Sequence, residues 1–176
     1  NDRESVRIMI ESSPEVISDL VGYGVDFSRN EAGEFNYTRE GAHTTNRILF
    51  HRDITGKEIT SKLLAEVQKR KNIEILEYTT LLDIIEKDGE CAGAVISMPD
   101  GTVKTVAAEY TVMATGGIGG LYRHSTNFRH LTGDGVAIAI KHGIELKNVN
   151  YIQIHPTTLY SEKTEDRSFL ISESVR

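Results

Sequence analysis

The stretch VMATGGIGG at residues 112–120 decides how the rest of the sequence is interpreted. It continues a short apolar strand expected over residues 110–114, which runs directly into glycines. Because glycine has no β-carbon, its backbone can pass close to a ligand, and its N–H group can face a phosphate or a ring. The stretch is not a dinucleotide fingerprint, since G-x-G-x-x-G from Gly117 would need glycine at Tyr122. Taken alone, it fits a ligand-contacting turn and a plain connection after a core strand equally well.

A second glycine motif, TGDG at residues 132–135, comes immediately before a helix expected over residues 133–142. Thr132 or Asp134 can cap this helix, which is the commoner use of such residues. Alternatively, a carboxylate between two glycines can approach a ribose or ribitol hydroxyl and accept its hydrogen bond. Residues 144–151 are expected to begin a further strand.

The region before the first glycine motif alternates polar and apolar residues with the period of β-strands. Turn residues separate the runs at residues 87–90 and 99–101, where Asp-Gly pairs favour hairpins. The pattern predicts a β-meander that follows one more strand. The expected strands span residues 73–78, 79–86, 91–98 and 102–107.

Helical periodicity dominates nearer the start of the sequence. Residues 3–22 predict one amphipathic helix, or a pair broken at residues 13–15, where Ser13 suits an N-cap and Pro14 the first position of a second helix. Residues 55–71 predict a second helix with basic side chains at its C-terminal end. Residues 28–46 predict a long loop with one short strand at residues 35–37. These elements define an α/β fold class.

Composition limits the class of protein further. The 176 residues carry 20 basic and 26 acidic side chains, a net charge of −6, and 39% hydrophobic residues. This balance suits a globular chain, and it offers no basic patch for nucleic acid. No apolar run approaches the ~20 residues of a membrane span.

The single cysteine, Cys91, cannot form an internal disulfide and makes no zinc set, so no metal site is expected. A reducing compartment, the cytoplasm, is therefore expected. The chain has no initiator Met and ends abruptly, which suggests an internal fragment of a longer protein.

Polar residues in the last quarter of the chain are candidates for chemistry. His155 precedes Pro156, which biases its backbone to an extended form that holds the imidazole at a fixed angle. A lone histidine is nevertheless more often structural. Ser172, Glu173 and Arg176 combine an alcohol, a carboxylate and a guanidinium. They suit a pocket for a small acid, or only a solvated helix start with an ion pair.

The loop over residues 39–47 contains two arginines, one glutamate and one histidine. Such loops usually meet only solvent. The mixture also suits an amino-acid or dicarboxylate substrate, because cations bind carboxylates and an anion binds an ammonium group.

In this order, these segments resemble the L-aspartate oxidases, a branch of the flavoprotein family of succinate dehydrogenase and fumarate reductase. TGDG and HPT are shared across that family, whereas REGAH at residues 39–43 is similar to the aspartate oxidases in particular. The resemblance covers the whole chain but only the middle part of a family member. The matching segments span residues 38–43, 47–49, 53–58, 114–117, 132–135, 153–157 and 169–173.

The resemblance implies an FAD-binding domain over residues 1–148, with the meander inserted in it, and the start of a capping domain over residues 149–176. The first domain would be partial, because the N-terminal βαβ unit with its pyrophosphate fingerprint is missing. FAD is the implied cofactor. Its implied contacts are Thr80, Leu81, Thr115, Gly116, Gly117 and Asp134.

The resemblance also implies a substrate site. Glu40 would orient the amino group of L-aspartate, and His155, Ser172 and Glu173 would bind around the dicarboxylate. Ser172 stands where threonine is more usual but keeps the hydroxyl donor. The family's proton-transferring arginine would lie beyond residue 176, so the chain alone is expected to be inactive.

The implied activity is FAD-dependent oxidation of L-aspartate to iminoaspartate, with molecular oxygen or fumarate as the acceptor. Iminoaspartate would pass to quinolinate synthase in NAD biosynthesis. One alternative is a fumarate reductase or succinate dehydrogenase flavoprotein subunit, whose substrate lacks the amine. A second is a non-catalytic binding module, which would carry no flavin.

Overall fold

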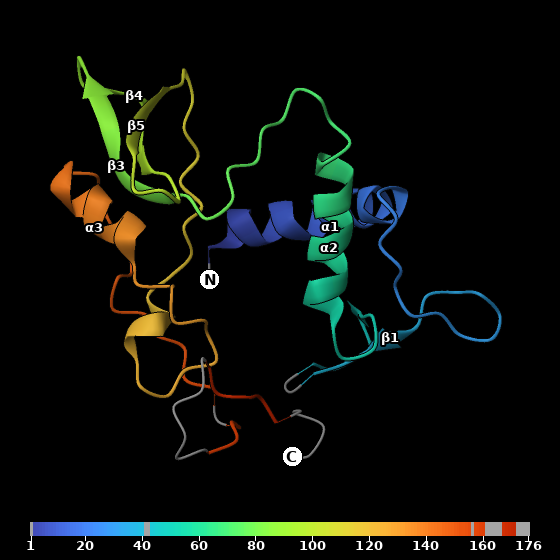
Figure 1. The fold of residues 1–176 in the computed structure, drawn as a ribbon. Coiled ribbons are helices and arrows are strands. Elements are labelled where there is room, and N and C mark those ends of the chain that lie inside the picture. The colour runs from blue at the N-terminus through green and yellow to red at the C-terminus, as the bar shows by residue number, and fades with distance from the viewer. Residues whose placement is uncertain (1, 41–42, 156, 161–166, 172–176) are drawn as a thin grey trace. The chain divides into compact units, whose positions relative to one another are not determined.

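The chain divides into two compact units, unit 1 over residues 1–75 and unit 2 over residues 76–176 (Figure 1). The computed structural model describes residues 2–40, 43–155, 157–160 and 167–171. Ser172 and Glu173, two of the expected substrate residues, lie outside the described residues. None of the described helices has the length and hydropathy needed to cross a bilayer.

Helix α1 (Arg3–Gly22) is one continuous helix, so the expected break near Pro14 is wrong. Asp2 caps its first turn by accepting a backbone N–H group. Pro14 cannot donate to the carbonyl of Ile10, but the hydroxyl of Ser13 donates to that carbonyl at 2.9 Å. The serine therefore satisfies the carbonyl that the proline leaves without a donor, and the helix continues.

A small two-stranded sheet follows α1. Strand β1 (Tyr37–Thr38) pairs antiparallel with β2 (Ile48–Leu49). The strand expected at residues 35–37 is thus displaced toward the C-terminus, and Phe35 makes only an isolated bridge. Phe27 is buried and meets Phe35 edge to face, with ring centroids 6.2 Å apart. The sheet and this aromatic contact form the base of the loop over residues 39–47.

Helix α2 (Thr55–Val67) confirms the second expected helix, although residues 68–71 lie beyond its end. Glu58 in its first turn accepts a hydrogen bond from the backbone N–H of Asp26 at 3.0 Å. This bond connects the start of α2 to the segment that precedes the loop.

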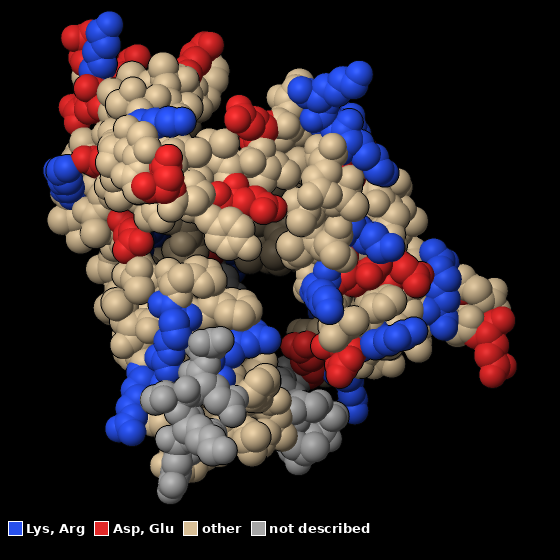
Figure 2. Space-filling model, in the orientation of Figure 1, with Lys and Arg blue, Asp and Glu red and all other residues tan. Residues whose placement is uncertain are grey.

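Unit 2 contains a three-stranded antiparallel sheet in the order β3-β4-β5, as the meander pattern predicted (Figure 1). Its strands are β3 (Thr80–Lys87), β4 (Glu90–Ser97) and β5 (Val103–Ala107). Asp88 and Gly89 connect β3 to β4 with φ angles of 55° and 82°, the pair of left-handed residues that a tight hairpin requires. A β-carbon at Gly93 would lie 2.0 Å from the carbonyl oxygen of Val106, so glycine is needed for β5 to pair with β4 here. Figure 2 shows acidic and basic side chains interspersed over the visible face of β3–β5.

Helix α3 (Asp134–Lys141) confirms the third expected helix and lies beside β3 (Figure 1). Its Ile138 and Ala139 are buried. A short 3₁₀ helix, η1 (Gly119–Leu121), begins at the end of the first glycine motif and precedes α3. The structure therefore mixes helices and strands as the α/β class predicts.

Three expected strands are wrong. Residues 73–78, 110–114 and 144–151 are described, and none of them lies in a strand. The side chain of Val112 is 89% exposed, and no described segment forms a ladder with residues 110–114. An apolar run supplies β-propensity, but a strand also needs a neighbour for its N–H and C=O groups.

Candidate functional site

The two glycine motifs lie against each other in unit 2. A β-carbon at Gly135 would lie 2.1 Å from Oγ1 of Thr115 and 3.0 Å from the sulfur of Met113. A β-carbon at Gly133, where φ is 78°, would lie 2.5 Å from Cγ2 of Ile118. Because real β-carbons do not approach other atoms so closely, glycine is required at both positions for the first turn of α3 to reach the glycine-ended segment.

Gly116 and Gly117 have different surroundings. Gly116 has a φ of 73°, and a β-carbon there would lie 2.9 Å from the side chain of Leu131. Around Gly117, apart from the glycine itself and its two chain neighbours, no atom of the described residues lies within 4 Å of the β-carbon position. Both glycines are exposed, but only Gly117 has open space at its β-carbon position, and its backbone is accessible to a ligand.

Asp134 is the first residue of α3 and is exposed. The residue that caps α3 is Gly133, which has no side chain, so the interpretation of Thr132 or Asp134 as the cap is wrong. The hydroxyl of Thr132 instead donates to Oδ1 of Asp134 at 2.9 Å. Within the described part of the chain, Oδ2 of Asp134 accepts no hydrogen bond, so this oxygen is available to a hydroxyl of a ligand.

Thr80 and Leu81 begin β3 and pair with Ser97 and Ile96 of β4. Thr80 is exposed and Leu81 is half-buried. Tyr78, two residues earlier, has a φ of 54° and is 88% exposed, so the chain turns sharply where β3 begins.

His155 is half-buried in the wall of a hollow of about 170 Å³. Its Nδ1 accepts a hydrogen bond from the backbone N–H of Thr157 at 3.3 Å, which helps to fix the ring. The wall is formed by two segments, residues 119–127 and 153–158. Its residues are Gly119, Tyr122, His124, Ser125, Thr126, Asn127, Gln153, Ile154, His155 and Thr158.

Glu40 belongs to unit 1 and is exposed. Its backbone N–H donates to Nδ1 of His43 at 3.3 Å, and its carbonyl accepts from the N–H of His43 at 3.1 Å. Arg47 donates to the hydroxyls of Thr44 and Thr45. In the described part of this loop, the carboxylate of Glu40 has no hydrogen-bond or ion-pair partner. His43 thus holds the backbone while the charge of Glu40 is left accessible.

The expected site residues are therefore brought together only in part. The structure places Thr115 and Gly116 next to the turn that carries Asp134, which brings together three of the six expected cofactor residues. His155 lies in a polar hollow of the same unit, whose wall also contains Gly119 from the first glycine motif. Glu40 lies in the other unit.

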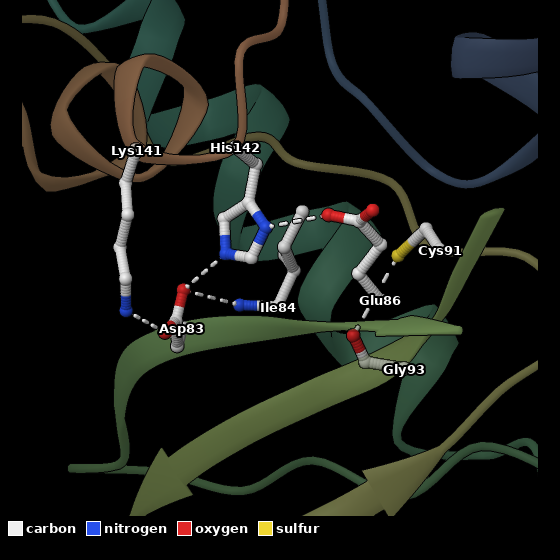
Figure 3. Close-up of polar contacts among 7 residues, drawn as sticks. All are labelled: Asp83, Ile84, Glu86, Cys91, Gly93, Lys141 and His142. Carbon is white, nitrogen blue, oxygen red and sulfur yellow. Dashed lines mark hydrogen bonds and ion pairs between the residues drawn. The ribbon is translucent and has the colours of Figure 1, made fainter. Parts of the chain in front are cut away.

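One charged cluster was not expected from the sequence (Figure 3). Nε2 of His142 lies 2.8 Å from Oδ1 of Asp83, and Nδ1 of His142 lies 3.1 Å from Oε2 of Glu86. Lys141 also donates to the carboxylate of Asp83. Hydrogen bonds from Lys141 and His142 lower the pKa of Asp83 to about 2, and the carboxylates of Glu86 and Asp83 raise the pKa of His142. The cluster joins the C-terminal end of α3 to β3.

Comparison with known proteins identifies the class. The model of the FAD binding domain family matches residues 1–176, so the chain belongs to the FAD-binding domain family, whose cofactor is FAD. An L-aspartate oxidase of Clostridium acetobutylicum is 48% identical over 176 residues, covering 100% of this chain and 40% of that protein. The chain spans about 40% of the length of the first curated relatives that it matches.

Solved structures share the fold. A mutant of E. coli quinol fumarate reductase matches with a TM-score of 0.77 and 32% identity, over 80% of this chain and 24% of that one. The open conformation of a flavocytochrome c3 fumarate reductase matches with a TM-score of 0.82 and 25% identity, over 99% of this chain and 31% of that one. The chain therefore has the fold of the flavoproteins to which the fumarate reductases belong.

Proposed function

We propose that this chain supplies part of the FAD site and part of the substrate site of an FAD-dependent L-aspartate oxidase. The observation that carries the proposal is the contact between the glycine-ended segment and the first turn of α3, beside the accessible carboxylate of Asp134. The 48% identity with an L-aspartate oxidase supports the choice of substrate. The proposed reaction oxidises L-aspartate to iminoaspartate, with molecular oxygen or fumarate as the final acceptor.

The residues of unit 2 fit FAD. Residues 115–117 offer backbone groups next to an open glycine, and Oδ2 of Asp134 is free to accept a hydrogen bond from a hydroxyl of FAD. Residues 80–81 are proposed to add backbone contacts from the start of β3. Bound FAD supplies the acceptor for the hydride that leaves the substrate, and the task of these residues is to hold and orient it.

For the substrate, we assign Glu40 to the ammonium group and His155 to a carboxylate. An ammonium group in a partly dry site needs an anion, and Glu40 has its carboxylate accessible. His155 lies in a polar hollow that no described Asp or Glu side chain lines. Ser172 and Glu173, outside the described residues, are proposed to bind around the same dicarboxylate. Together these groups would hold the substrate in a reactive orientation.

The wider setting follows the same proposal. Residues 1–148 would belong to the FAD-binding domain with the meander inserted in it, and residues 149–176 would begin a capping domain over the substrate. Proton transfer would fall to an arginine outside these 176 residues. Iminoaspartate would pass to quinolinate synthase in NAD biosynthesis, in the cytoplasm, which suits the single Cys91.

The test uses the full-length protein in which this sequence occurs. We expect purified protein to show a flavin absorption band in about one-to-one ratio, and to form hydrogen peroxide when L-aspartate is added in air. The 176 residues expressed alone should hold FAD weakly and oxidise no aspartate. A full-length protein without flavin would contradict the proposal and point to a non-catalytic binding module.

A fumarate reductase or succinate dehydrogenase flavoprotein subunit is the second candidate. The structural match to quinol fumarate reductase at 32% identity favours it. The two candidates differ in the amine of the substrate, so turnover of L-aspartate and of succinate by the same flavin-loaded protein separates them. Succinate oxidation without aspartate oxidation would establish the second candidate.

A further inference from the structure

The hollow around His155 has the size and the lining of a small-acid site. Its volume of about 170 Å³ is far above the roughly 10–15 Å³ needed to hold one water. Eight of its ten lining residues carry side chains that are able to form hydrogen bonds, and the exceptions are Gly119 and Ile154. None of the lining residues is acidic. A polar cavity without carboxylates suits an anion.

The two stretches of sequence that contain the lining segments also lack acidic residues. Residues 111–131 contain Arg123 and Arg129 and no acidic residue, and residues 146–160 contain Lys147 and no acidic residue. The two segments that form the wall therefore bring only neutral or basic side chains with them. An anionic ligand meets no like charge from either segment.

His124 is the second imidazole in this wall, and it comes from the other of the two lining segments. Its ring lies 6.0 Å from the ring of Tyr160, centroid to centroid, at an angle of 38°. Neither ring nitrogen of His124 has a hydrogen-bond partner among the described residues. The ring is thus supported by an aromatic neighbour while its nitrogens are available to a ligand.

The backbone around His124 is held on both sides. The guanidinium of Arg129 donates to the carbonyls of Tyr122 and Arg123 at 2.5 and 2.7 Å. The carbonyl of Ser125 accepts from the N–H of Ser168 at 2.6 Å. A histidine on a fixed backbone loses less conformational entropy when it binds a ligand than one on a free loop.

We propose that His124 is a specificity-determining residue, which donates a hydrogen bond to one carboxylate of the dicarboxylate substrate while His155 contacts the substrate from the other lining segment. This inference rests on the proposed function, because it names a second group of the same substrate site. It explains why two imidazoles that are 31 residues apart in sequence line one hollow with no acidic residue among its lining residues.

The test measures steady-state kinetics of the flavin-loaded full-length protein with L-aspartate. His124→Phe keeps a ring beside Tyr160 but removes both nitrogens, and His124→Gln keeps one donor. Loss of a hydrogen bond to a charged group typically corresponds to a tenfold to hundredfold change in binding, so KM should rise about tenfold or more in His124→Phe. The turnover number should change by less than about threefold, because the lost contact is made equally in ground and transition states. His124→Gln should show a smaller rise in KM.

His130→Phe is the matched control, because His130 stacks on Phe128 at 5.6 Å and does not line the hollow. Its KM should equal that of the wild type. An unchanged KM in both His124 variants would overturn the proposal, as would a fall in turnover number at constant KM. Flavin loss in the His124 variants alone would assign this loop to the cofactor instead and would also overturn it.

A binding measurement separates this inference from the proposed function. Succinate and butyrate, which has one carboxylate fewer, are titrated while the flavin absorption is followed. His124→Phe should weaken the binding of succinate about tenfold and the binding of butyrate much less. Equal effects on the binding of the two acids would overturn the inference. If the wild type binds succinate but does not oxidise L-aspartate, the proposed function fails while the titration still decides the role of His124.

Discussion

Two regions of the molecule are built on opposite principles. One is the contact between the two glycine motifs in unit 2, and the other is the loop that carries Glu40 in unit 1. In unit 2, the first turn of α3 comes so close to the glycine-ended segment that no β-carbon fits at Gly133 or Gly135. In unit 1, the described part of the loop is held by hydrogen bonds between Glu40 and His43, and the carboxylate of Glu40 is accessible. The close fit of the backbone is the main property of the first region, and an accessible negative charge is the main property of the second. Substitutions that change volume should therefore disturb the first, and substitutions that change charge should disturb the second.

Glu40→Gln in the full-length protein should have the largest effect. Glutamine keeps the size and one acceptor oxygen but loses the charge, so a buried substrate ammonium would lose its counter-ion. Removing one partner of a buried charge pair costs on the order of 3 kcal/mol, or about a hundredfold in kcat/KM for L-aspartate. Fumarate has no ammonium, so its reduction by the reduced flavin should fall much less.

The matched control is Glu31→Gln, another exposed glutamate of unit 1 that lies outside the loop over residues 39–47. It should leave kcat/KM for both substrates unchanged. Equal losses for L-aspartate and fumarate in Glu40→Gln would contradict the assigned role. Glu40 would then hold the loop or the flavin, and the contrast between charge and shape would not hold for unit 1.

Asp134→Ala tests whether charge also matters in the region that shape determines. Asp134 is the only acidic residue between residues 113 and 135. A hydrogen bond to a charged group is worth about 1.5 to 3 kcal/mol, so FAD affinity should fall roughly tenfold to a hundredfold. Equilibrium dialysis of the flavin measures this, with Glu145→Ala, an exposed acid just after α3, as the control. If FAD affinity is unchanged, the carboxylate of Asp134 only stabilises the N-terminal end of α3.

Two neighbouring glycine variants sharpen the comparison from the side of shape. Gly135→Ala places a methyl group where Oγ1 of Thr115 lies 2.1 Å away, so it should destabilise the protein by about 1–3 kcal/mol. In Gly117→Ala, the new β-carbon has no described atom within 4 Å beyond its own residue and its two chain neighbours. The substitution should change stability by less than about 0.5 kcal/mol, yet weaken the binding of FAD. Thermal unfolding without flavin and flavin titration separate the two effects. Equal stability of the two variants would show that the first turn of α3 moves freely.

Local patterns predicted the parts of the fold that depend on local interactions. The meander, α2 and α3 follow from periodicity and turn residues, and all three occur within one to four residues of the expected bounds. The predicted break in α1 was wrong because Ser13 donates to the carbonyl that Pro14 leaves open. The expectation that proline breaks a helix does not take into account a hydrogen bond from a neighbouring serine.

The remaining errors concern partners that are distant in sequence. Residues 110–114 have strand propensity but no described neighbour to pair with. The motifs around Thr115 and Asp134 were both noticed, yet their contact depends on how α3 packs. His124 was missed because nothing in its local sequence marks it, and only the hollow shared with His155 does so. His142 and Asp83 are 59 residues apart, so no local pattern joins them.

The cluster of His142, Asp83, Glu86 and Lys141 gives the smallest predicted effect, because Lys141 and Glu86 are more than half exposed and solvent screens them. The raised pKa of His142 means that its contribution to stability is complete below its ordinary value of 6.5 and is lost as the pH rises through the raised value. The pKa of Asp83, lowered from 3.8 to about 2, means that its contribution is complete above 3.8 and is lost as the pH falls toward 2. Both contributions are therefore present between pH 3.8 and 6.5.

His142→Gln should accordingly lower the melting temperature of the full-length protein most within that window and least at alkaline pH. Thermal unfolding of wild type and variant at about pH 5.5 and about pH 9 measures the difference, and His130→Gln controls for the loss of a histidine that makes no ion pair with the described acids. Asp83→Asn should reduce the effect of His142→Gln, because the two side chains form one contact. A melting-temperature difference that is the same at both pH values would mean that packing of α3 on β3, and not the charge of His142, holds this end of the helix. Shape would then determine the C-terminal end of α3 as it does the N-terminal end.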